Sequence, residues 1–183
     1  MARNILQEAN SRWFYDELNT MDNYSVLEIG TLRWEKDKPT HHKDIFPKAN
    51  EYIMTDVQAG IDVDIVSDIH SLSDVFGENR FDVIFIPSVF EHLRKPWIAA
   101  KEVLKTLKPK GLFFVQTHQT FPLHGYPHDY YRYTKEGLEI LFEDASEKHA
   151  FHEFPCQIVP PEVIVIWSKS APAFLNSAIT GKK

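Results

Sequence analysis

The sequence predicts an α/β fold: a seven-stranded, mostly parallel sheet with an antiparallel last strand and helices on both faces. Short apolar segments alternate with amphipathic ones along most of the chain, which is typical of parallel strands joined by right-handed helical crossovers. Near the C-terminus this alternation stops, and two extended runs, 149–159 and 163–168, are joined by a short connection that contains Pro160 and Pro161. So short a connection pairs them as antiparallel neighbours.

The N-terminal part of the chain supplies the first helix and three strands. Apolar residues recur at helical spacing from Ile5 to Leu18, which predicts a helix over residues 4–20. Strands are expected at residues 25–29, 51–56 and 63–66. The segment 31–50 between the first two strands is polar, and a short helix within it is expected to end before Pro47.

The second part of the chain continues the alternation. Residues 81–86 predict a fourth strand that is apolar enough to be buried on both faces. Pro96 stands where a helix begins, and residues 97–107 carry an apolar stripe along it. Residues 112–115 predict a fifth strand, and Thr134 predicts the N-cap of a final helix.

Composition limits the class of protein and its partners. A chain of 183 residues suits one domain, and we expect its core to span residues 25–168, with a frayed tail over 170–183. The single cysteine, Cys156, excludes an internal disulfide framework and predicts a reducing, cytoplasmic location. No apolar run approaches the roughly 20 residues that span a bilayer, and the first ten residues lack the apolar block of a secretory signal. The net charge of -6 does not favour binding to nucleic acid or to an anionic membrane surface, both of which are negatively charged. A small molecule or glycan is therefore the expected partner.

Three successive strands end in an acid or a glycine. The first ends at Glu28 and Gly30, the second at Asp56 and the third at Asp68. The carboxyl ends of parallel strands meet at the edge of the sheet where nucleotide-like ligands bind. Asp56 lies 26 positions beyond Gly30, near the interval at which an acid takes ribose hydroxyls. Asp68 can accept a hydrogen bond from an adenine amino group while the Ile69 amide serves a ring nitrogen, so the set indicates an adenosyl cofactor and methyl transfer.

Several of these segments together resemble the class I S-adenosylmethionine-dependent methyltransferases, a Rossmann-like family. They are Val26–Gly30, Asp56, Ser67–His70, Phe81–Leu93 and Leu107–Val115. Within them, Ser88–Leu93 and Leu107–Gly111 are similar to the fourth and fifth strand motifs of the small-molecule branch. The stretch Phe121–Arg132 is similar to a loop in relatives associated with glycan and secondary-metabolite genes. The resemblance covers residues 25–168.

The resemblance implies a cofactor site at the carboxyl ends of the first four strands. Its members would be Glu28 and Gly30 on the methionine side, Asp56 and Val57 at the ribose, Asp68 and Ile69 at adenine, and Ser88 at the methionine amino group. The chain departs from the family after Gly30, because Thr31, Leu32 and Arg33 stand where further glycines are expected. Arg33 is a candidate for binding the cofactor carboxylate in their place.

The chemistry requires positioning and, for a hydroxyl acceptor, a base. The sulfonium methyl is already activated, so catalysis is chiefly in-line placement of the nucleophile, and imidazole suits proton removal near neutral pH. The candidate bases lie near the carboxyl edge of the fourth and fifth strands: His92, His118 and His124. The loop beyond supplies a polar and aromatic wall for the acceptor: His128, Tyr130, Tyr131 and Arg132. We therefore expect O-methylation of a small-molecule or glycan-type acceptor.

Other functions are weighed against this one. The histidines of the second half of the chain are not paired with cysteine or a carboxylate in a recognised ligand motif, so no metal site is predicted. Tyr131 and Lys135 form the Tyr-x-x-x-Lys pair of NAD(P)-dependent short-chain oxidoreductases, but Thr134 predicts a helix start between them. A methyltransferase-like domain that binds cofactor or a partner without catalysis stays an alternative, because the loop after Gly30 is altered.

Overall fold

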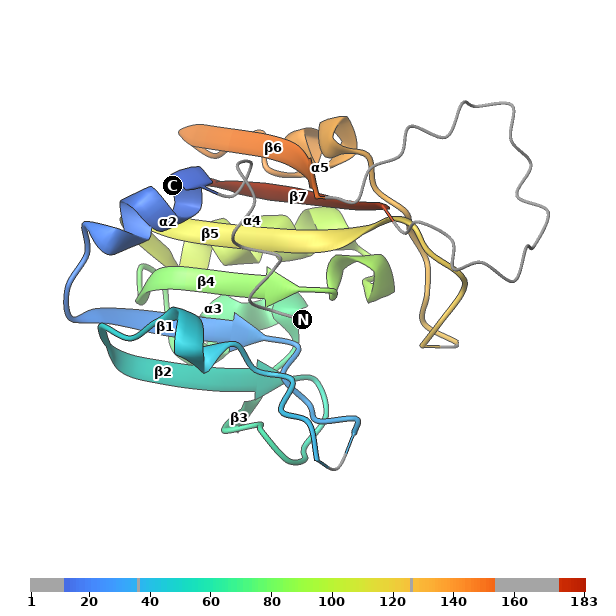
Figure 1. The fold of residues 1–183 in the computed structure, drawn as a ribbon, viewed down its shortest axis with the longest axis horizontal. Coiled ribbons are helices and arrows are strands. Elements are labelled where there is room, and N and C mark those ends of the chain that lie inside the picture. The colour runs from blue at the N-terminus through green and yellow to red at the C-terminus, as the bar shows by residue number, and fades with distance from the viewer. Residues whose placement is uncertain (1–11, 36, 126, 154–174) are drawn as a thin grey trace.

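The seven strands form one sheet in the order β3-β2-β1-β4-β5-β7-β6 (Figure 1). The computed structural model describes residues 12–35, 37–125, 127–153 and 175–183. From β3 to β5 all neighbouring strands are parallel, whereas β7 runs antiparallel to both β5 and β6. The strands are β1 Tyr24–Ile29, β2 Ala49–Asp56, β3 Ile65–Val66, β4 Phe81–Pro87, β5 Leu107–Thr120, β6 Glu147–Glu153 and β7 Leu175–Lys182. This topology confirms the fold class predicted from the sequence.

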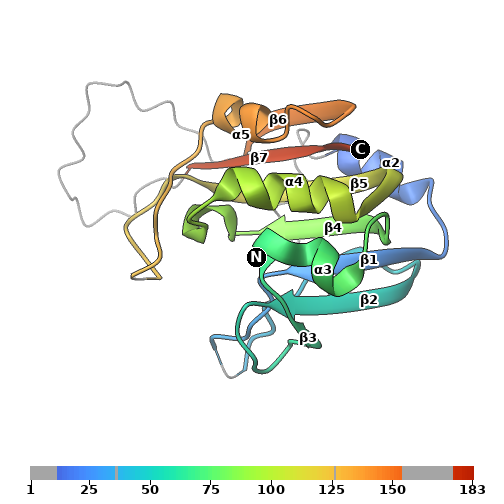
Figure 2. The same ribbon diagram turned by 180° about the vertical axis from the view of Figure 1, so that it is seen from behind.

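Helices cover both faces of the sheet. One face carries α2 (Arg12–Asn19) and the 3-10 turn η1 (Lys43–Ile45), as Figure 1 shows. The opposite face carries α3 (Leu72–Phe76), α4 (Pro96–Thr106) and α5 (Lys135–Leu141), seen in Figure 2. Because side chains alternate along a strand, β4 sends Phe85 into the core beneath α2 and Ile84 into the core beneath α4. Both are buried, as expected for a strand covered on each face.

The ends of the helices follow the sequence signals. Pro96 is the first residue of α4, where its missing N–H costs no helical hydrogen bond. Thr134 caps α5, with its hydroxyl accepting a hydrogen bond from the Gly137 N–H at 3.1 Å. The helix expected over residues 4–20 is observed as α2 in its second half, and residues 1–11 lie outside the described part of the chain.

The C-terminal strands differ from the expectation. The first of the pair is β6, and the second lies at 175–182. The frayed tail expected over 170–183 is therefore wrong for residues 175–182, whereas the run 163–168 lies outside the described residues. This strand is not strongly apolar, but it is held between β5 and β6 by backbone pairing on both sides. Gly181 fits because a side chain there would overlap the ring of Phe113 and the Glu147 carbonyl.

Asp82 joins three strands at the amino edge of the sheet. Its Oδ2 accepts hydrogen bonds from the Ser25 N–H at 2.9 Å, the Ser25 hydroxyl at 2.8 Å and Lys108 Nζ at 2.9 Å. Burial alone would raise the pKa of Asp82, but the hydrogen bonds from Ser25 and Lys108 outweigh it and hold the pKa below its usual range. The charged carboxylate therefore stabilises the alignment of β1, β4 and β5.

Candidate functional site

The carboxyl ends of β1 and β4 are in direct contact at Gly30. This residue has a φ of +87°, in the left-handed region that favours glycine. A Cβ at this position would overlap the side chain of Val89, which follows β4. The Gly30 N–H donates to the Thr55 carbonyl at 2.8 Å. The backbone of this turn is therefore fixed close to the end of β2.

Asp56 ends β2 and holds two loop amides. Its Oδ2 accepts a hydrogen bond from the Leu32 N–H at 3.2 Å and its Oδ1 from the Gln58 N–H at 3.1 Å. A carboxylate offers about four lone-pair positions, so both oxygens can still accept hydrogen bonds from a ligand. Val57 follows β2, with its side chain largely exposed.

Asp68 follows β3 and presents an open carboxylate oxygen. Its Oδ1 accepts hydrogen bonds from the His70 N–H at 2.9 Å and from His70 Nδ1 at 2.6 Å. Its Oδ2 accepts none from the described residues, and the side chain is 55% exposed. Burial would raise the pKa of Asp68, but the hydrogen bonds from His70 hold it below its usual value. The side chain of Ile69 is buried in the core, so this residue can contact a ligand only through its backbone.

Glu28 is turned into the protein and away from the open edge. Its side chain is 1% exposed and accepts a hydrogen bond from the His42 N–H at 2.9 Å, with His42 Nδ1 at 2.7 Å. The Tyr52 hydroxyl donates to the same carboxylate. Glu28, expected on the methionine side of a cofactor, is thus engaged in holding the β1–β2 loop.

Side chains hold this loop where glycines were expected. The Thr31 hydroxyl donates to the Asp62 carbonyl at 2.6 Å. Arg33 forms an ion pair with the Asp62 carboxylate through Nε at 2.6 Å and a second nitrogen at 2.9 Å. The guanidinium hydrogen bond lowers the pKa of Asp62, as expected for a closely paired carboxylate. Arg33 is therefore engaged with Asp62, which argues against its candidacy as the partner of a cofactor carboxylate.

Ser88 forms the turn after β4. It has a φ of +53°, its N–H donates to the Gln116 carbonyl at 2.8 Å, and its hydroxyl donates to Gln116 Oε1 at 3.2 Å. These contacts fix β4 against β5 just before the 3-10 turn η3 (Phe90–His92).

The three histidines expected as bases converge on one buried carboxylate, that of Glu91. The side chain of Glu91 is fully buried, and its Oε2 accepts a hydrogen bond from the Thr117 hydroxyl at 2.6 Å. Around Oε1 lie three imidazole nitrogens: His118 Nε2 at 3.2 Å, His124 Nε2 at 3.9 Å and His92 Nε2 at 4.0 Å. Among the described residues Oε1 has no partner with hydrogen-bond geometry. We call these four residues the Glu91 cluster.

The loop after β5, described at residues 121–125 and 127–132, returns to Glu91. The Glu91 carbonyl accepts hydrogen bonds from the N–H groups of Tyr130 at 2.8 Å and Tyr131 at 3.2 Å. The Tyr133 N–H donates to the His118 carbonyl at 3.0 Å and closes the loop. The loop is thus attached to the backbone at Glu91, after β4, and at His118, in β5. Tyr130 is exposed at this edge, with its hydroxyl 2.9 Å from His128 Nδ1.

Arg132 holds the loop together from within. A guanidinium has five N–H donors, and all five are used. They pair with both carboxylate oxygens of Asp129 and with the carbonyls of Phe121, Pro122 and Tyr131. The hydrogen bonds from Arg132 hold the pKa of Asp129 well below its usual range. Expected to bind the acceptor, Arg132 has no N–H left for a ligand and is reassigned to the loop.

Sequence reasoning gave no role to Glu91 or Asp129. Glu91 stands in the apolar and aromatic run Val89–Leu93, where a charged residue is unusual. That isolation was the available signal of a buried, paired carboxylate. Asp129 lies three residues before Arg132, a spacing that carries no comparable signal in a loop.

The positions of Tyr131 and Lys135 argue against a short-chain oxidoreductase. Those enzymes carry the Tyr-x-x-x-Lys residues within one helix, whereas Thr134 caps α5 and leaves Tyr131 in the loop before it. The Tyr131 hydroxyl is directed toward the Arg94 carbonyl, at 3.5 Å.

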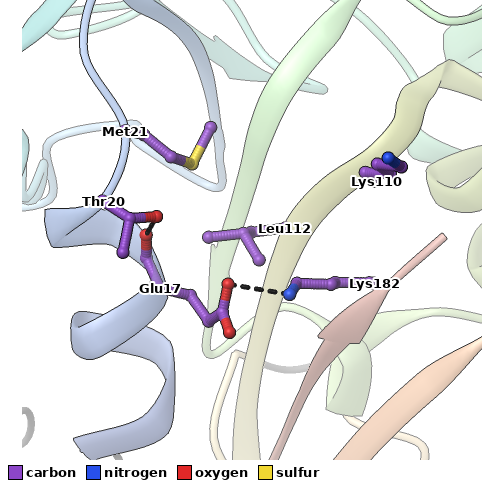
Figure 3. A pocket seen from close by; sticks show the side chains of 6 residues that line it. All are labelled: Glu17, Thr20, Met21, Lys110, Leu112 and Lys182. Carbon is purple, nitrogen blue, oxygen red and sulfur yellow. Dashed lines mark hydrogen bonds and ion pairs between the residues drawn. The ribbon is translucent and has the colours of Figure 1, made fainter.

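A cavity of about 420 Å³ lies at the other edge of the sheet, between α2 and the start of β5 (Figure 3). Its lining residues are Glu17, Thr20, Met21, Lys110, Leu112 and Lys182. Glu17 and Lys182 form an ion pair of 2.7 Å there. Because Lys110 and Leu112 lie near the amino end of β5, the length of the strands separates this cavity from the candidate residues.

Comparison with known proteins identifies the fold. Residues 40–115 match the family model described as a methyltransferase domain. An S-adenosylmethionine-dependent methyltransferase from Archaeoglobus fulgidus superposes with a TM-score of 0.62 at 15% identity, covering 94% of each chain. The chain has the class I methyltransferase fold. The resemblance drawn from the sequence is confirmed at the level of the fold.

Two further solved structures share the methyltransferase fold. One is an S-adenosylmethionine-dependent methyltransferase from Mesorhizobium loti, with a TM-score of 0.59, 12% identity and coverage of 96% of this chain and 99% of that one. The other is the 1,6-didemethyltoxoflavin-N1-methyltransferase of Burkholderia thailandensis, solved with 1,6-didemethyltoxoflavin and S-adenosylhomocysteine bound. It has a TM-score of 0.58 at 15% identity and covers 100% of this chain and 83% of that one. No curated protein sequence matches the chain, and no helix among the described residues is long and apolar enough to cross a membrane.

Proposed function

We propose that this chain is a cytoplasmic S-adenosylmethionine-dependent methyltransferase that modifies a hydroxyl group of a small-molecule or glycan-type acceptor. The observation that carries the proposal is the pair of carboxylates at the ends of β2 and β3. Asp56 and Asp68 stand at the edge where the open sheets of this fold class bind nucleotide-like ligands. Both retain acceptor positions for a ligand.

The residues at this edge fit the parts of the cofactor. Asp56 would accept hydrogen bonds from the ribose hydroxyls, and Asp68 Oδ2 would accept one from the adenine amino group. Val57 is an exposed apolar side chain just past the end of β2, where a purine ring would cover it. Ser88 would meet the methionine amino group through its carbonyl oxygen, since its N–H is used by Gln116.

The cofactor, when bound, supplies an activated methyl group. The chain's own contribution is to hold the acceptor in line with it and to take the acceptor's proton. The Glu91 cluster suits proton removal because the buried carboxylate would stabilise the imidazolium that forms. His118 is the favoured base, since its Nε2 lies nearest to Glu91 Oε1. His128, Tyr130 and Tyr131 would line the acceptor side.

A non-catalytic domain of the same fold is the alternative. The observation that favours it is the β1–β2 loop, in which Arg33 is engaged with Asp62 and Glu28 with His42 and Tyr52. This arrangement leaves no assigned partner for the cofactor carboxylate. Cofactor affinity separates the two functions only in part, because a non-catalytic domain can bind either the cofactor or a partner; turnover decides between them.

The test begins with calorimetric titration of the protein with S-adenosylhomocysteine, with NAD as the control ligand. Micromolar binding of the first alone supports the proposal, whereas binding of NAD alone contradicts it. Asp68→Ala should weaken binding by about 1–3 kcal/mol, roughly ten- to a hundredfold. Asp74→Ala, an acid in α3 outside this edge, is the matched control and should bind as wild type does. Unchanged affinity in a folded Asp68→Ala variant would remove the adenine assignment.

An acceptor screen follows if the cofactor binds. Methyl transfer to hydroxylated small molecules and sugars, detected by the mass of the product, would establish catalysis. Cofactor binding without transfer to any class of acceptor would favour the non-catalytic alternative.

A further inference from the structure

The Glu91 cluster brings one oxygen and three nitrogens together at the carboxyl edge of the sheet. We propose that Glu91, His92 and His124 bind a divalent transition-metal ion of the kind represented by Zn²⁺, with His118 beside the site. The proposal rests on burial, on the hydrogen bonds behind the imidazoles and on the type of ligand atom.

The carboxylate of Glu91 lacks a partner on its inward oxygen. Buried polar atoms in folded proteins are almost always hydrogen-bonded, and a buried carboxylate is costly without a compensating charge. Thr117 satisfies Oε2, but Oε1 accepts no hydrogen bond from the described residues. His118 Nε2 is 3.2 Å away, without the geometry of a hydrogen bond. The fully buried oxygen is directed at the three imidazoles.

The contacts of His92 determine which of its nitrogens faces Glu91. Its Nδ1 lies 2.7 Å from the carbonyl oxygen of His128. A carbonyl oxygen can only accept a hydrogen bond, so Nδ1 must carry the proton. In the neutral imidazole Nε2 then holds a lone pair, and this nitrogen is the one directed at Glu91 Oε1.

His124 repeats the arrangement. Its Nδ1 lies 3.2 Å from the Pro122 carbonyl and 3.3 Å from Asp129 Oδ2, both of which are acceptors. The proton is therefore on Nδ1, and the Nε2 lone pair faces Glu91. A donated hydrogen bond from the far nitrogen to a carbonyl or carboxylate is the usual support of a metal-binding histidine.

Lone pairs therefore converge on a negatively charged oxygen. Protonating the two Nε2 atoms would not give Oε1 a hydrogen-bond donor, because the Nε2 atoms of His92 and His124 lie 4.0 and 3.9 Å from it, beyond hydrogen-bond range. A cation among Glu91 Oε1 and the Nε2 atoms of His92 and His124 would satisfy all three at once.

The distances and donor types point to a particular class of ion. The ligand atoms of Glu91, His92 and His124 all lie within 4.8 Å of one another. A tetrahedral Zn²⁺ with bonds of about 2.0–2.1 Å holds its ligands about 3.3 Å apart, so a small inward shift of the loop that carries His124 would complete the site. Imidazole nitrogens favour Zn²⁺ and similar ions over Ca²⁺ and Mg²⁺, which prefer oxygen.

Bound at this edge, the ion could bind the acceptor hydroxyl and lower its pKa, replacing a histidine as the source of the activated oxygen. This role rests on the proposed function, whereas ion binding itself does not. The two are therefore tested by separate titrations.

The experiment is calorimetric titration of the metal-free full-length protein with Zn²⁺, repeated with Co²⁺ and followed by visible absorption. We expect one ion per chain in the wild type. His124→Ala and His92→Ala should weaken binding tenfold to a hundredfold or more. His149→Ala removes an exposed histidine outside the cluster and should bind as the wild type does. Thermal unfolding of each variant checks that it is folded.

Titration with S-adenosylhomocysteine is run on the same samples. Loss of Zn²⁺ binding with retained cofactor affinity in His124→Ala supports the metal site. A wild type that does not bind Zn²⁺, or variants that bind it as tightly as the wild type, would overturn it. Failure of cofactor binding in every sample would instead remove the proposed function and leave the metal result standing.

Discussion

Replacing Glu91 by glutamine tests the arrangement of lone pairs directly. The substituted side chain would keep the size and shape of the original and change one carboxylate oxygen into an NH₂ group. With its carbonyl oxygen accepting from Thr117, the new NH₂ would occupy the place of Oε1 and face the imidazole nitrogens. A donor would then replace an acceptor opposite the lone pairs. We therefore expect the metal-free Glu91→Gln protein to be more stable than the wild type.

The magnitude follows from the unsatisfied oxygen. A buried polar group without a partner costs about 1–3 kcal/mol, and part of this is regained because the loop needs only a small shift to meet the new donor. We expect a gain of about 1–2 kcal/mol in the free energy of unfolding. For a protein of this size each kcal/mol moves the melting temperature by about 2–4 °C, so the increase should be about 2–8 °C.

The assay is thermal unfolding followed by circular dichroism, in EDTA at about pH 8, where free imidazoles are neutral. Glu147→Gln, at a surface glutamate of β6, is the control and should melt within a degree or two of the wild type. Added Zn²⁺ should stabilise the wild type and leave the Glu91→Gln variant unchanged. A variant destabilised by about 3–5 kcal/mol would refute the reasoning, because it would show that Glu91 pairs with protonated histidines.

Three other substitutions test contacts that hold the strands and loops around the site. Asp82→Asn should lower the free energy of unfolding by about 1.5–3 kcal/mol at pH 7, because it weakens the bond to Lys108. The folded pKa of Asp82 is lowered, so urea titrations should show the difference from the wild type disappearing as the pH falls below about 4. Gly30→Ala should cost about 1–3 kcal/mol from its positive φ, plus the overlap with Val89, and a second Val89→Ala change should recover only the overlap. Arg132→Lys keeps the charge but loses the forked hydrogen bonds, so the KM for the acceptor should rise. Calorimetry should find the affinity for S-adenosylhomocysteine unchanged. A lower affinity would contradict the assignment of this residue to the loop.

The fold could be predicted because its signals are local. Apolar runs ending in Gly30, Asp56 and Asp68, together with Pro96 and Thr134 at helix starts, mark strands and helices without any knowledge of distant contacts. The last strand could not be placed in this way. Its stability comes from pairing with β5 and β6, and a strand held on both sides needs little apolar character of its own.

The site was predictable only in part, for a related reason. The sequence places the three candidate histidines near the carboxyl ends of β4 and β5, which the topology brings together. It does not predict that they meet at one point. The sequence does not show that Glu91 lies among them, or that Arg132 uses every N–H on its own loop. Both facts depend on where side chains from separate segments point, and spacing along the chain carries no record of that.

The loop that follows β5 is attached to the sheet at two points, through the carbonyl of His118 and the carbonyl of Glu91. Both attachments use backbone atoms, whereas the shape of the loop between them depends on the pairing of Arg132 with Asp129. An exchange of this loop with that of a related protein would therefore have to carry Asp129 and Arg132 together. The anchors at Tyr130 and Tyr133 would keep the graft in register with the cofactor edge. The side chains that face an acceptor could thus change without changing the backbone contacts that hold the loop to the sheet.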